Sequence, residues 1–379
     1  MQEEYIGEGS LENLKQVIEE INAKKILLLT GKKSYSSSSA KSKIAPFLKD
    51  IEVTRFSDFE VNPKIEDVYS GVNLVTNNSP DLIIAIGGGT VIDMAKLINI
   101  LSTQKEHSFI NIINDCNLIH NKSLSPLVAI PTTSGTGSEA THFAVVYTDK
   151  KKYSLAHEFM LPDYVIVDSS LSYSLPKNIA ASVAIDALSQ AVESYWSVGS
   201  TAESQHYARQ SIEIILESIE GAVIKMDAGA KDAMALAANL SGKAINISKT
   251  TAAHAISYPI STFFNVPHGH AVGLLLGCFF EINSDFERYG INDPRGASYL
   301  TNTVQQLCNL FGAENPLDCK LVWYKMMNDI GLQTNIYKLG VRTTNDIDLI
   351  CENVNLERLN NNPVIVNEET LRNTLNSLF

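Results

Sequence analysis

The stretch DLIIAIGGGTVIDMAKLINIL, residues 81–101, indicates the fold of the first half of the chain. A short apolar run is followed by Gly87, Gly88 and Gly89 and then by a helical pattern that begins near Thr90. Glycines between a strand and a helix let the backbone approach a pyrophosphate, whose charge is met by free N–H groups and the positive end of the helix. We therefore predict a nucleotide-binding turn, with an ordinary tight turn as the alternative.

Strand-and-helix units repeat on both sides of this stretch. The other apolar runs are KKILLLT (24–30), IEVTRF (51–56), PLVAIPTT (126–133) and DYVIVDSSL (163–171), and helical patterns lie between the earlier ones. Continuous apolar strands separated by helices are typical of a doubly wound parallel sheet with both faces covered. The sequence therefore predicts an α/β domain, in which FAVVYTD and KKYSLAH add a strand-like pair between residues 143 and 157.

The second half of the chain changes character near residue 178. Nearly every later segment has the apolar periodicity of a helix, as in AASVAIDALSQAVESYW, residues 180–196. A chain of 379 residues with 45% apolar content usually divides into two domains. We predict a dinucleotide-binding α/β domain over residues 1–177 and an all-helical domain over residues 178–379.

Composition argues against several classes of protein. The net charge of −12 disfavours nucleic-acid binding, which depends on clustered lysine and arginine. The five cysteines are odd in number and scattered, so neither a disulfide framework nor a thiolate zinc site is expected. The acidic start MQEEYIGEGSLENL lacks an export pattern, and no apolar run approaches the roughly 20 residues that cross a bilayer. We expect a cytoplasmic protein without a membrane partner.

A second loop resembles the first in composition. PTTSGTGSEAT, residues 131–141, also follows a strand and is rich in glycine and hydroxyl side chains that could contact a phosphate or a ribose. Two such loops at adjacent strand ends suit one dinucleotide lying across the carboxyl edge of the sheet. The residues expected to contact it are Gly87, Gly88, Gly89, Thr90, Asp93, Thr132, Thr133, Gly135 and Ser138.

The end of the first strand bears on the choice between NAD and NADP. Gly31 stands where an acidic residue usually holds the adenosine ribose hydroxyls of NAD. A carboxylate there would repel a 2′-phosphate, whereas Lys32, Lys33 or Ser34 could bind it. We expect NADPH to serve at least as well as NADH, unless both lysines are simply solvated surface charges.

Four residues in the second half form a spaced set of metal ligands. Asp186 and Gln190 are four residues apart, so a helix places both on one face. His254 and His268 lie at positions from which a helix and the loop after it could bring both imidazoles to one ion. The alternative is that the aspartate pairs locally and the histidines are ordinary polar residues.

Together these motifs resemble the iron-containing (group III) alcohol dehydrogenases. GGGTVIDMAK, PTTSGTGSE, Asp186 with its partner four residues on, and His254 through PHG occur in the order found in that family and span essentially the whole chain. The resemblance implies the dehydroquinate synthase-like fold, with a dinucleotide-binding domain, a helical domain and Fe²⁺ or Zn²⁺ in the cleft between them. It also implies a homodimer.

Two positions depart from the family pattern. Gln190 stands where the first histidine ligand is expected, and a glutamine offers only a neutral carbonyl oxygen, so metal affinity is expected to fall. Tyr258 stands where many members carry a second histidine near the nicotinamide. The chain therefore has no imidazole at that position for a proton relay, and Tyr258, His270 or a water chain remain as proton donors.

The resemblance implies reversible hydride transfer between NADPH or NADH and an aldehyde carbon, with the metal ion polarising the carbonyl. Within the family, TTAAHAISYP, PHGHAVG and KKYSLAH look most similar to phosphonoacetaldehyde reductases, which form 2-hydroxyethylphosphonate. A phosphonate needs cationic or N–H donors, for which Lys249, His142 and His270 are candidates, although each could also be an ordinary polar residue.

Three other functions remain open. The chain could reduce general aldehydes or oxidise diols, it could be a lyase of the dehydroquinate synthase type, or it could bind a nucleotide without catalysis. A substrate panel, the net change in nicotinamide absorbance and elemental analysis distinguish them.

Overall fold

The computed structural model describes residues 2–61, 63–122, 125–148 and 151–379. The chain divides into two units, Met1–Leu175 and Pro176–Phe379. This division lies two residues before the expected boundary between residues 177 and 178.

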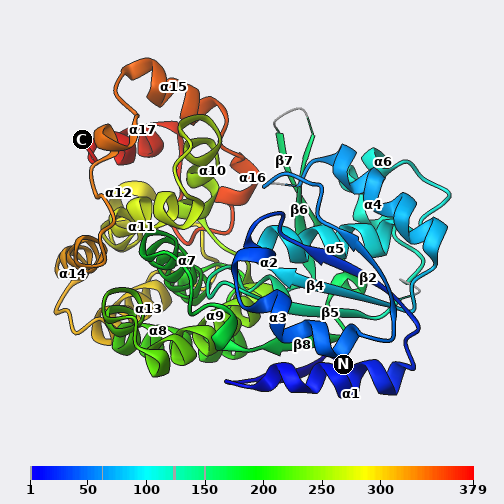
Figure 1. Ribbon diagram of the computed structural model, residues 1–379. Coiled ribbons are helices and arrows are strands. Elements are labelled where there is room, and N and C mark those ends of the chain that lie inside the picture. Colours follow the sequence, from blue (N-terminus) through cyan, green and yellow to red (C-terminus); the bar gives the residue numbers. More distant parts are fainter. Residues whose placement is uncertain (1, 62, 123–124, 149–150) are drawn as a thin grey trace. The chain divides into compact units, whose positions relative to one another are not determined.

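A six-stranded parallel sheet forms the centre of the first unit (Figure 1). Its central strands are buried along almost their whole length, because helices cover both faces. The predicted doubly wound parallel sheet is confirmed. In spatial order the strands are β1 (Glu3–Ile6), β8 (Tyr164–Val167), β5 (Leu127–Pro131), β4 (Leu82–Gly87), β2 (Lys25–Thr30) and β3 (Glu52–Phe56).

Alternate residues of the central strands enter two different cores. Leu27 and Leu29 of β2 pack with α4 (Ile65–Asn78) and α5 (Gly89–Leu101), whereas Ile26 and Leu28 pack with α1 (Asn13–Ile21). Each fully buried leucine or isoleucine contributes roughly 1.5–3 kcal/mol of transfer free energy. The sheet is thus fixed from both sides, and its carboxyl edge is a rigid base for the loops that follow β2, β4 and β5.

The remaining elements of the first unit are short. The predicted strand-like pair forms an antiparallel hairpin of β6 (Phe143–Thr148) and β7 (Lys151–Ala156), and Asp149, at the end of the predicted run, lies outside the described residues. The short helices are α2 (Ser34–Ser37), α3 (Ala40–Ile44) and α6 (Phe109–Asn114).

Helices and turns make up the described part of the second unit, with one isolated bridge between Ile291 and Val364. This confirms the predicted helical half of the fold. No helix in the described part of the chain is both long and apolar enough to cross a membrane. The helices are α7 (Lys177–Trp196), α8 (Ala202–Glu220), α9 (Ala228–Ser248), α10 (Ala252–Phe264), α11 (His268–Ser284), α12 (Phe286–Tyr289), α13 (Ala297–Leu310), α14 (Pro316–Asp329), α15 (Thr344–Glu352), α16 (Leu356–Leu359) and α17 (Glu368–Asn376).

The central helix α7 packs against α8, α9 and α11 and is buried from Ala184 to Trp196. It approaches α11 closely at Gly269, where an added Cβ atom would lie 2.0 Å from the carbonyl oxygen of Ser182 and 2.6 Å from the Cβ of Asp186. A hydrogen atom is therefore the largest side chain that fits at position 269. This close approach sets His268 beside Asp186.

Candidate functional site

Three of the four predicted metal ligands meet in the second unit. Asp186 on α7, His254 on α10 and His268 at the start of α11 each offer one ligand atom, and these atoms all lie within 4.8 Å of one another. Gln190 lies one turn along α7, with its Nε2 3.5 Å from Oδ2 of Asp186. The structure therefore brings the four residues together from three helices.

The environment of His254 fits a bound cation. Its Nε2 atom is buried, has no hydrogen-bond partner among the described residues and lies 3.6 Å from Oδ1 of Asp186. Burial lowers the pKa of His254, but the carboxylates of Glu193 and Asp186 outweigh burial and raise it to about 10. The two carboxylates therefore surround this ring with negative charge, which favours a cation bound at Nε2.

Glu193 is a functional residue that the sequence analysis did not single out. It is fully buried on α7, and one carboxylate oxygen, Oε2, accepts a hydrogen bond from Nδ1 of His254. With the proton held on Nδ1, the lone pair on Nε2 points to the cluster, as in many metal-binding histidines. The spacing of Asp186, Gln190 and Glu193, at i, i+4 and i+7 of one helix face, was the available signal.

The same carboxylate also caps α10. Its Oε1 atom accepts hydrogen bonds from the amide of Thr251 at 3.1 Å, the hydroxyl of Thr251 at 2.7 Å and the amide of His254 at 3.2 Å. A cap is normally supplied by the residue that begins the helix. Because Glu193 supplies it from α7, the orientation of the His254 ring and the start of its helix are fixed by one side chain.

Gln190 is held by Ser241, whose hydroxyl donates to Oε1 of the amide at 3.2 Å. In this orientation the amide nitrogen faces Asp186. A half-turn of the amide would direct Oε1 to the cluster and Nε2 to the Ser241 hydroxyl, which can also accept. Gln190 can therefore complete the ligand set with a neutral oxygen.

Gln190→His is expected to tighten Zn²⁺ binding by about tenfold or more, because imidazole is a better ligand for this ion than an amide oxygen. Competition with a chromophoric chelator measures the affinity. Gln190→Ala is the paired variant and is expected to weaken binding. Equal affinities in all three proteins would remove position 190 from the ligand set.

The two predicted proton donors have different surroundings. The ring of Tyr258, one turn after His254 on α10, stacks on the ring of His268 with centroids 5.3 Å apart. The Nε2 atom of His270 lies 2.7 Å from the carbonyl oxygen of Gln333, and burial lowers the pKa of this histidine. Tyr258 therefore lies at the ligand cluster, whereas a backbone carbonyl engages a ring nitrogen of His270.

Two of the three predicted anion contacts, His142 and Lys249, lie in different units. His142 precedes β6 in the first unit, where its half-buried ring meets the edge of Phe143. Lys249 lies in the second unit between α9 and α10, is exposed, and has φ 62° and ψ 178°. This backbone region is normally restricted to glycine. The side chain of Asn361 holds the segment by donating to the carbonyls of Ser248 and Thr250.

The glycine loops of the first unit lie side by side, as predicted. Gly87 ends β4 and Gly88 caps α5, while the amide of Thr132, just after β5, donates to the carbonyl of Gly87 at 3.0 Å. A Cβ atom on Gly89 would lie 2.8 Å from the hydroxyl of Thr136. Position 89 of the first loop therefore has no room for a side chain, because Thr136 of the second loop packs against it.

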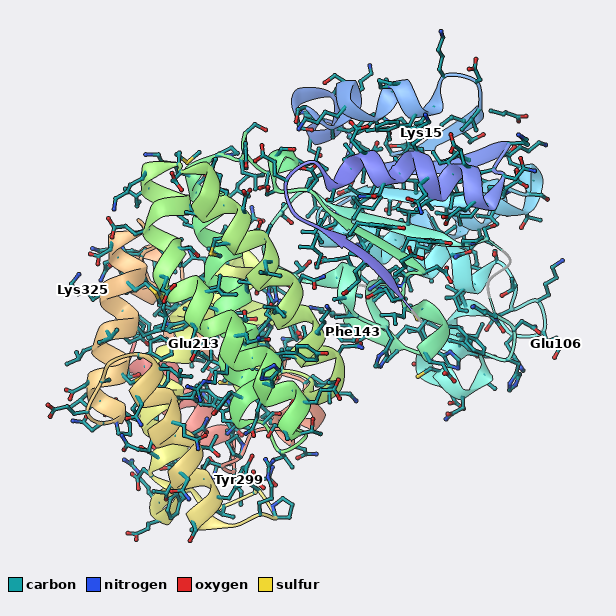
Figure 2. All side chains as sticks on the ribbon, turned by 90° about the horizontal axis from the view of Figure 1, so that it is seen from below. Lys15, Glu106, Phe143, Glu213, Tyr299 and Lys325 are labelled. Atoms are coloured by element: carbon teal, nitrogen blue, oxygen red, sulfur yellow. The ribbon has the colours of Figure 1, made fainter. Side chains whose placement is uncertain are left out.

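The structure places Asp93 and Ser138 beneath these loops and in contact with each other. The carboxylate of Asp93 accepts from the Ser138 hydroxyl at 2.5 Å and from the amide of Val145 at 3.0 Å. The buried ammonium of Lys96 donates to the carbonyl of Ser138 and, at 3.0 Å, to that of Phe143, which Figure 2 labels. Burial lowers the pKa of Lys96 to about 8, with Asp93 opposing the shift. These side chains anchor the second loop to α5.

The residues after β2 lie at the same edge of the sheet. Lys32 pairs with Asp58 at 2.8 Å, and a Cβ atom on Gly31 would lie 2.2 Å from Oγ of Ser34, whose side chain would have to turn away. Thr90 lies in the first turn of α5 and is half-buried. Arg55, which the sequence analysis did not single out, reaches Gly31 from β3.

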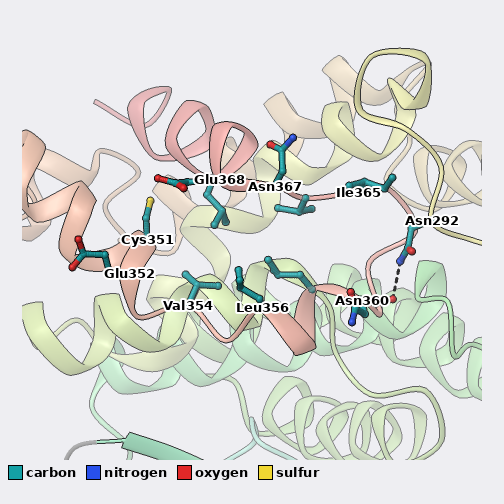
Figure 3. Close-up of a pocket in the computed structure, with 12 residues that line it drawn as sticks. Asn292, Cys351, Glu352, Val354, Leu356, Asn360, Ile365, Asn367 and Glu368 are labelled. Atoms are coloured by element: carbon teal, nitrogen blue, oxygen red, sulfur yellow. Dashed lines mark hydrogen bonds between the residues drawn. The ribbon is translucent and has the colours of Figure 1, made fainter.

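A pocket of about 530 Å³ lies elsewhere in the second unit, between α15, α16 and α17. Figure 3 shows Cys351, Glu352 and Glu368 at one end, with Asn292 and Asn360 at the other. None of the four candidate metal ligands is among its lining residues. The pocket is therefore not the metal cluster.

Comparisons with known proteins cover both units. Residues 2–169 match the model of the iron-containing alcohol dehydrogenases, and residues 180–379 match the C-terminal model of the Fe-containing alcohol dehydrogenase family. An NADPH-dependent butanol dehydrogenase of Clostridium saccharobutylicum is 32% identical over 92% of this chain and 88% of its own. An NAD-dependent methanol dehydrogenase of Bacillus methanolicus is 29% identical over 92% of this chain and 90% of its own.

Solved structures share the fold. Sulfoacetaldehyde reductase from Bifidobacterium kashiwanohense, in complex with NAD⁺, superposes with a TM-score of 0.87 and 26% identity over 100% of this chain and 96% of that one. The fold predicted from the sequence is therefore confirmed along the whole chain.

Proposed function

The chain belongs to the iron-containing alcohol dehydrogenase family, and from this premise we propose that it reduces an aldehyde bearing an anionic group, phosphonoacetaldehyde first among them, to the primary alcohol with NADPH or NADH. Family membership makes it an oxidoreductase of a class that uses a metal ion and a nicotinamide nucleotide. It favours this reaction over a lyase or a nucleotide-binding protein without catalysis. The observation that carries the proposal is the Asp186, His254 and His268 cluster.

The roles of the residues follow from their positions. When bound, a divalent ion supplies Lewis-acid stabilisation of the developing alkoxide, and the reduced nicotinamide supplies the hydride. Asp186, Gln190, His254 and His268 would hold the ion, and Glu193 orients His254. Tyr258, stacked on His268, is better placed to pass a proton to the product than His270, whose ring nitrogen meets the carbonyl of Gln333.

The backbone of Lys249 supports an anionic substrate. A side chain at φ 62° and ψ 178° costs about 1–3 kcal/mol relative to glycine. Residues held in such strained conformations cluster at active sites and ligand-binding segments. Lys249 is five residues before His254, and its exposed ammonium would attract a phosphonate or sulfonate. The sulfoacetaldehyde reductase similarity agrees with an anion of this kind.

Lys249→Ala is expected to raise KM for phosphonoacetaldehyde by about tenfold while changing KM for a neutral aldehyde of equal size by less than about twofold. Lys249→Gly is the companion variant, expected to give the same kinetic change with a higher Tm because glycine relieves the strain. Steady-state kinetics and thermal denaturation measure both effects. Equal changes in KM for both aldehydes would remove Lys249 from the substrate site.

A substrate panel tests the proposed function. With the metal-loaded enzyme, kcat/KM for phosphonoacetaldehyde is compared with those for sulfoacetaldehyde, butanal and 3-hydroxypropanal, with NADPH and with NADH. A higher kcat/KM for either anionic aldehyde than for the neutral ones supports the proposal. The larger of the two values for the anionic aldehydes shows whether a phosphonate or a sulfonate is preferred. Preference for butanal would favour a general alcohol dehydrogenase, the alternative that the butanol dehydrogenase relative favours.

A homodimer stays a prediction from the resemblance, and a cytoplasmic location stays a prediction from the N-terminal sequence. Light scattering coupled to gel filtration measures the first, and fractionation of the source cells measures the second.

A further inference from the structure

Arg55 is fixed at the carboxyl edge of the sheet. It lies on β3, which pairs in parallel with β2, and it reaches across to the end of that strand. Its Nε donates to the hydroxyl of Thr30 at 2.8 Å, and its Nη2 donates to the carbonyl of Gly31 at 3.1 Å. The guanidinium carbon lies 4.9 Å from the centroid of the Tyr35 ring. Three contacts therefore hold an exposed cation in one place.

These contacts leave one edge of the guanidinium available. An arginine has five N–H donors, and the fork formed by Nε and Nη2 takes the two protein acceptors. The other fork, formed by Nη1 and the second hydrogen of Nη2, has no protein acceptor among the described residues. A fork of two parallel N–H groups matches two oxygens of a phosphate group. Arg55 is also the only arginine in the first 175 residues of the sequence.

We propose that Arg55 recognises the 2′-phosphate of NADPH and is the main determinant of any preference for NADPH over NADH. The inference deepens the proposed function, since it names the part of the cofactor that this edge binds. In a doubly wound nucleotide-binding fold the adenosine ribose lies at the carboxyl end of one of the parallel strands. We assign this role to β2, which ends beside Gly31. The available edge of Arg55 belongs to a guanidinium that is anchored to this same glycine.

Lys32 is less suited to this role, although it follows Gly31 directly. Its ammonium is already paired with the exposed carboxylate of Asp58 at 2.8 Å. A phosphate bound by Lys32 would have to displace Asp58 or approach its negative charge. Arg55 has no carboxylate partner among the described residues, so its positive charge remains uncompensated for a dianionic phosphate.

Kinetics with both cofactors test the proposal. Arg55→Ala and Arg55→Gln are each expected to lower kcat/KM for NADPH by about 10- to 100-fold, because a charge-assisted fork is lost. The values for NADH are expected to stay within about twofold of the wild type. Lys32→Ala is the matched comparison, because it also removes one positive charge from this edge. It is expected to lower kcat/KM for NADPH by less than about threefold.

Binding of fragments separates this inference from the proposed reaction. Calorimetry compares adenosine 2′,5′-bisphosphate with adenosine 5′-monophosphate on the full-length protein, without an aldehyde. The wild type is expected to prefer the bisphosphate by at least about tenfold, and Arg55→Gln to abolish this preference. Equal weakening of both nucleotides would mean that Arg55 only supports Gly31, and unchanged binding would mean that it contacts neither; either result overturns the proposal. A protein that binds as expected but reduces no aldehyde would instead contradict the proposed function.

Discussion

Glu193→Gln is expected to weaken Zn²⁺ binding by about 10- to 100-fold while leaving the second unit folded. The substitution keeps the size of the side chain and one of its oxygens. That oxygen can still accept from the amide and hydroxyl of Thr251 and from the amide of His254. The cap of α10 is therefore preserved, and the change is confined to the bond with the imidazole.

The loss arises from the tautomer of His254. In the wild type, a carboxylate oxygen accepts the proton on Nδ1, which leaves Nε2 able to bind an ion. In Glu193→Gln an NH₂ group replaces that oxygen and cannot accept. The ring then either loses its partner or places its proton on Nε2, the atom that faces Asp186. Both outcomes oppose coordination.

Chelator competition measures the Zn²⁺ affinity, and circular dichroism with thermal denaturation of the metal-free protein checks the fold. Glu213→Gln is a matched control, since it removes one carboxylate from an exposed pair with Arg209 on α8 and is expected to change neither quantity. If Glu193→Gln bound Zn²⁺ like the wild type, Glu193 would be a helix cap and nothing more.

Part of the ligand cluster has a local signal in the sequence. Asp186 and Gln190 share a helix face by spacing alone, and the two glycine loops follow strands that are neighbours in the sheet. Glu193 has the same kind of signal at i+7, but a carboxylate inside a helix is usually a solvated side chain. Only the three-dimensional structure shows that it is buried and bonded to His254 of α10.

Other residues could not be identified from local patterns. Arg55 lies 24 residues from Gly31 along the chain, and only the pairing of β2 with β3 brings them together. Asp93 stands in a glycine-loop motif that predicts contact with the dinucleotide, and the motif does not indicate that its carboxylate also accepts hydrogen bonds from Ser138 and Val145. A motif predicts the local structure in which a residue lies. The residue's partners depend on segments that the motif does not contain.

The role of Gly269 also depends on a segment far from it in the sequence. From the sequence alone, a glycine is usually assigned to a loop turn. Gly269 lies inside α11 and not in a loop. Because it has no side chain, the backbone of α7 can approach α11 at this position. Gly269→Ala is expected to destabilise the protein by about 3 kcal/mol, near the upper end for overpacking, because the added methyl group meets a backbone carbonyl that cannot rotate away. The metal centre is expected to fail with it, since α11 must move and carries His268 away from Asp186.

Gly229→Ala is the control, at the second residue of α9 as Gly269 is the second residue of α11. Its added Cβ atom would lie 3.4 Å from Oδ1 of Asp227, an ordinary van der Waals contact, so a cost below about 1 kcal/mol is expected. Both variants gain the same helix propensity over glycine, which therefore cancels in the comparison. Thermal denaturation of the metal-free proteins is expected to show Tm lowered by about 6–12 °C in Gly269→Ala and by far less in Gly229→Ala. Equal Tm values would mean that α7 and α11 separate at little cost, and that the position of His268 does not depend on the close approach at Gly269.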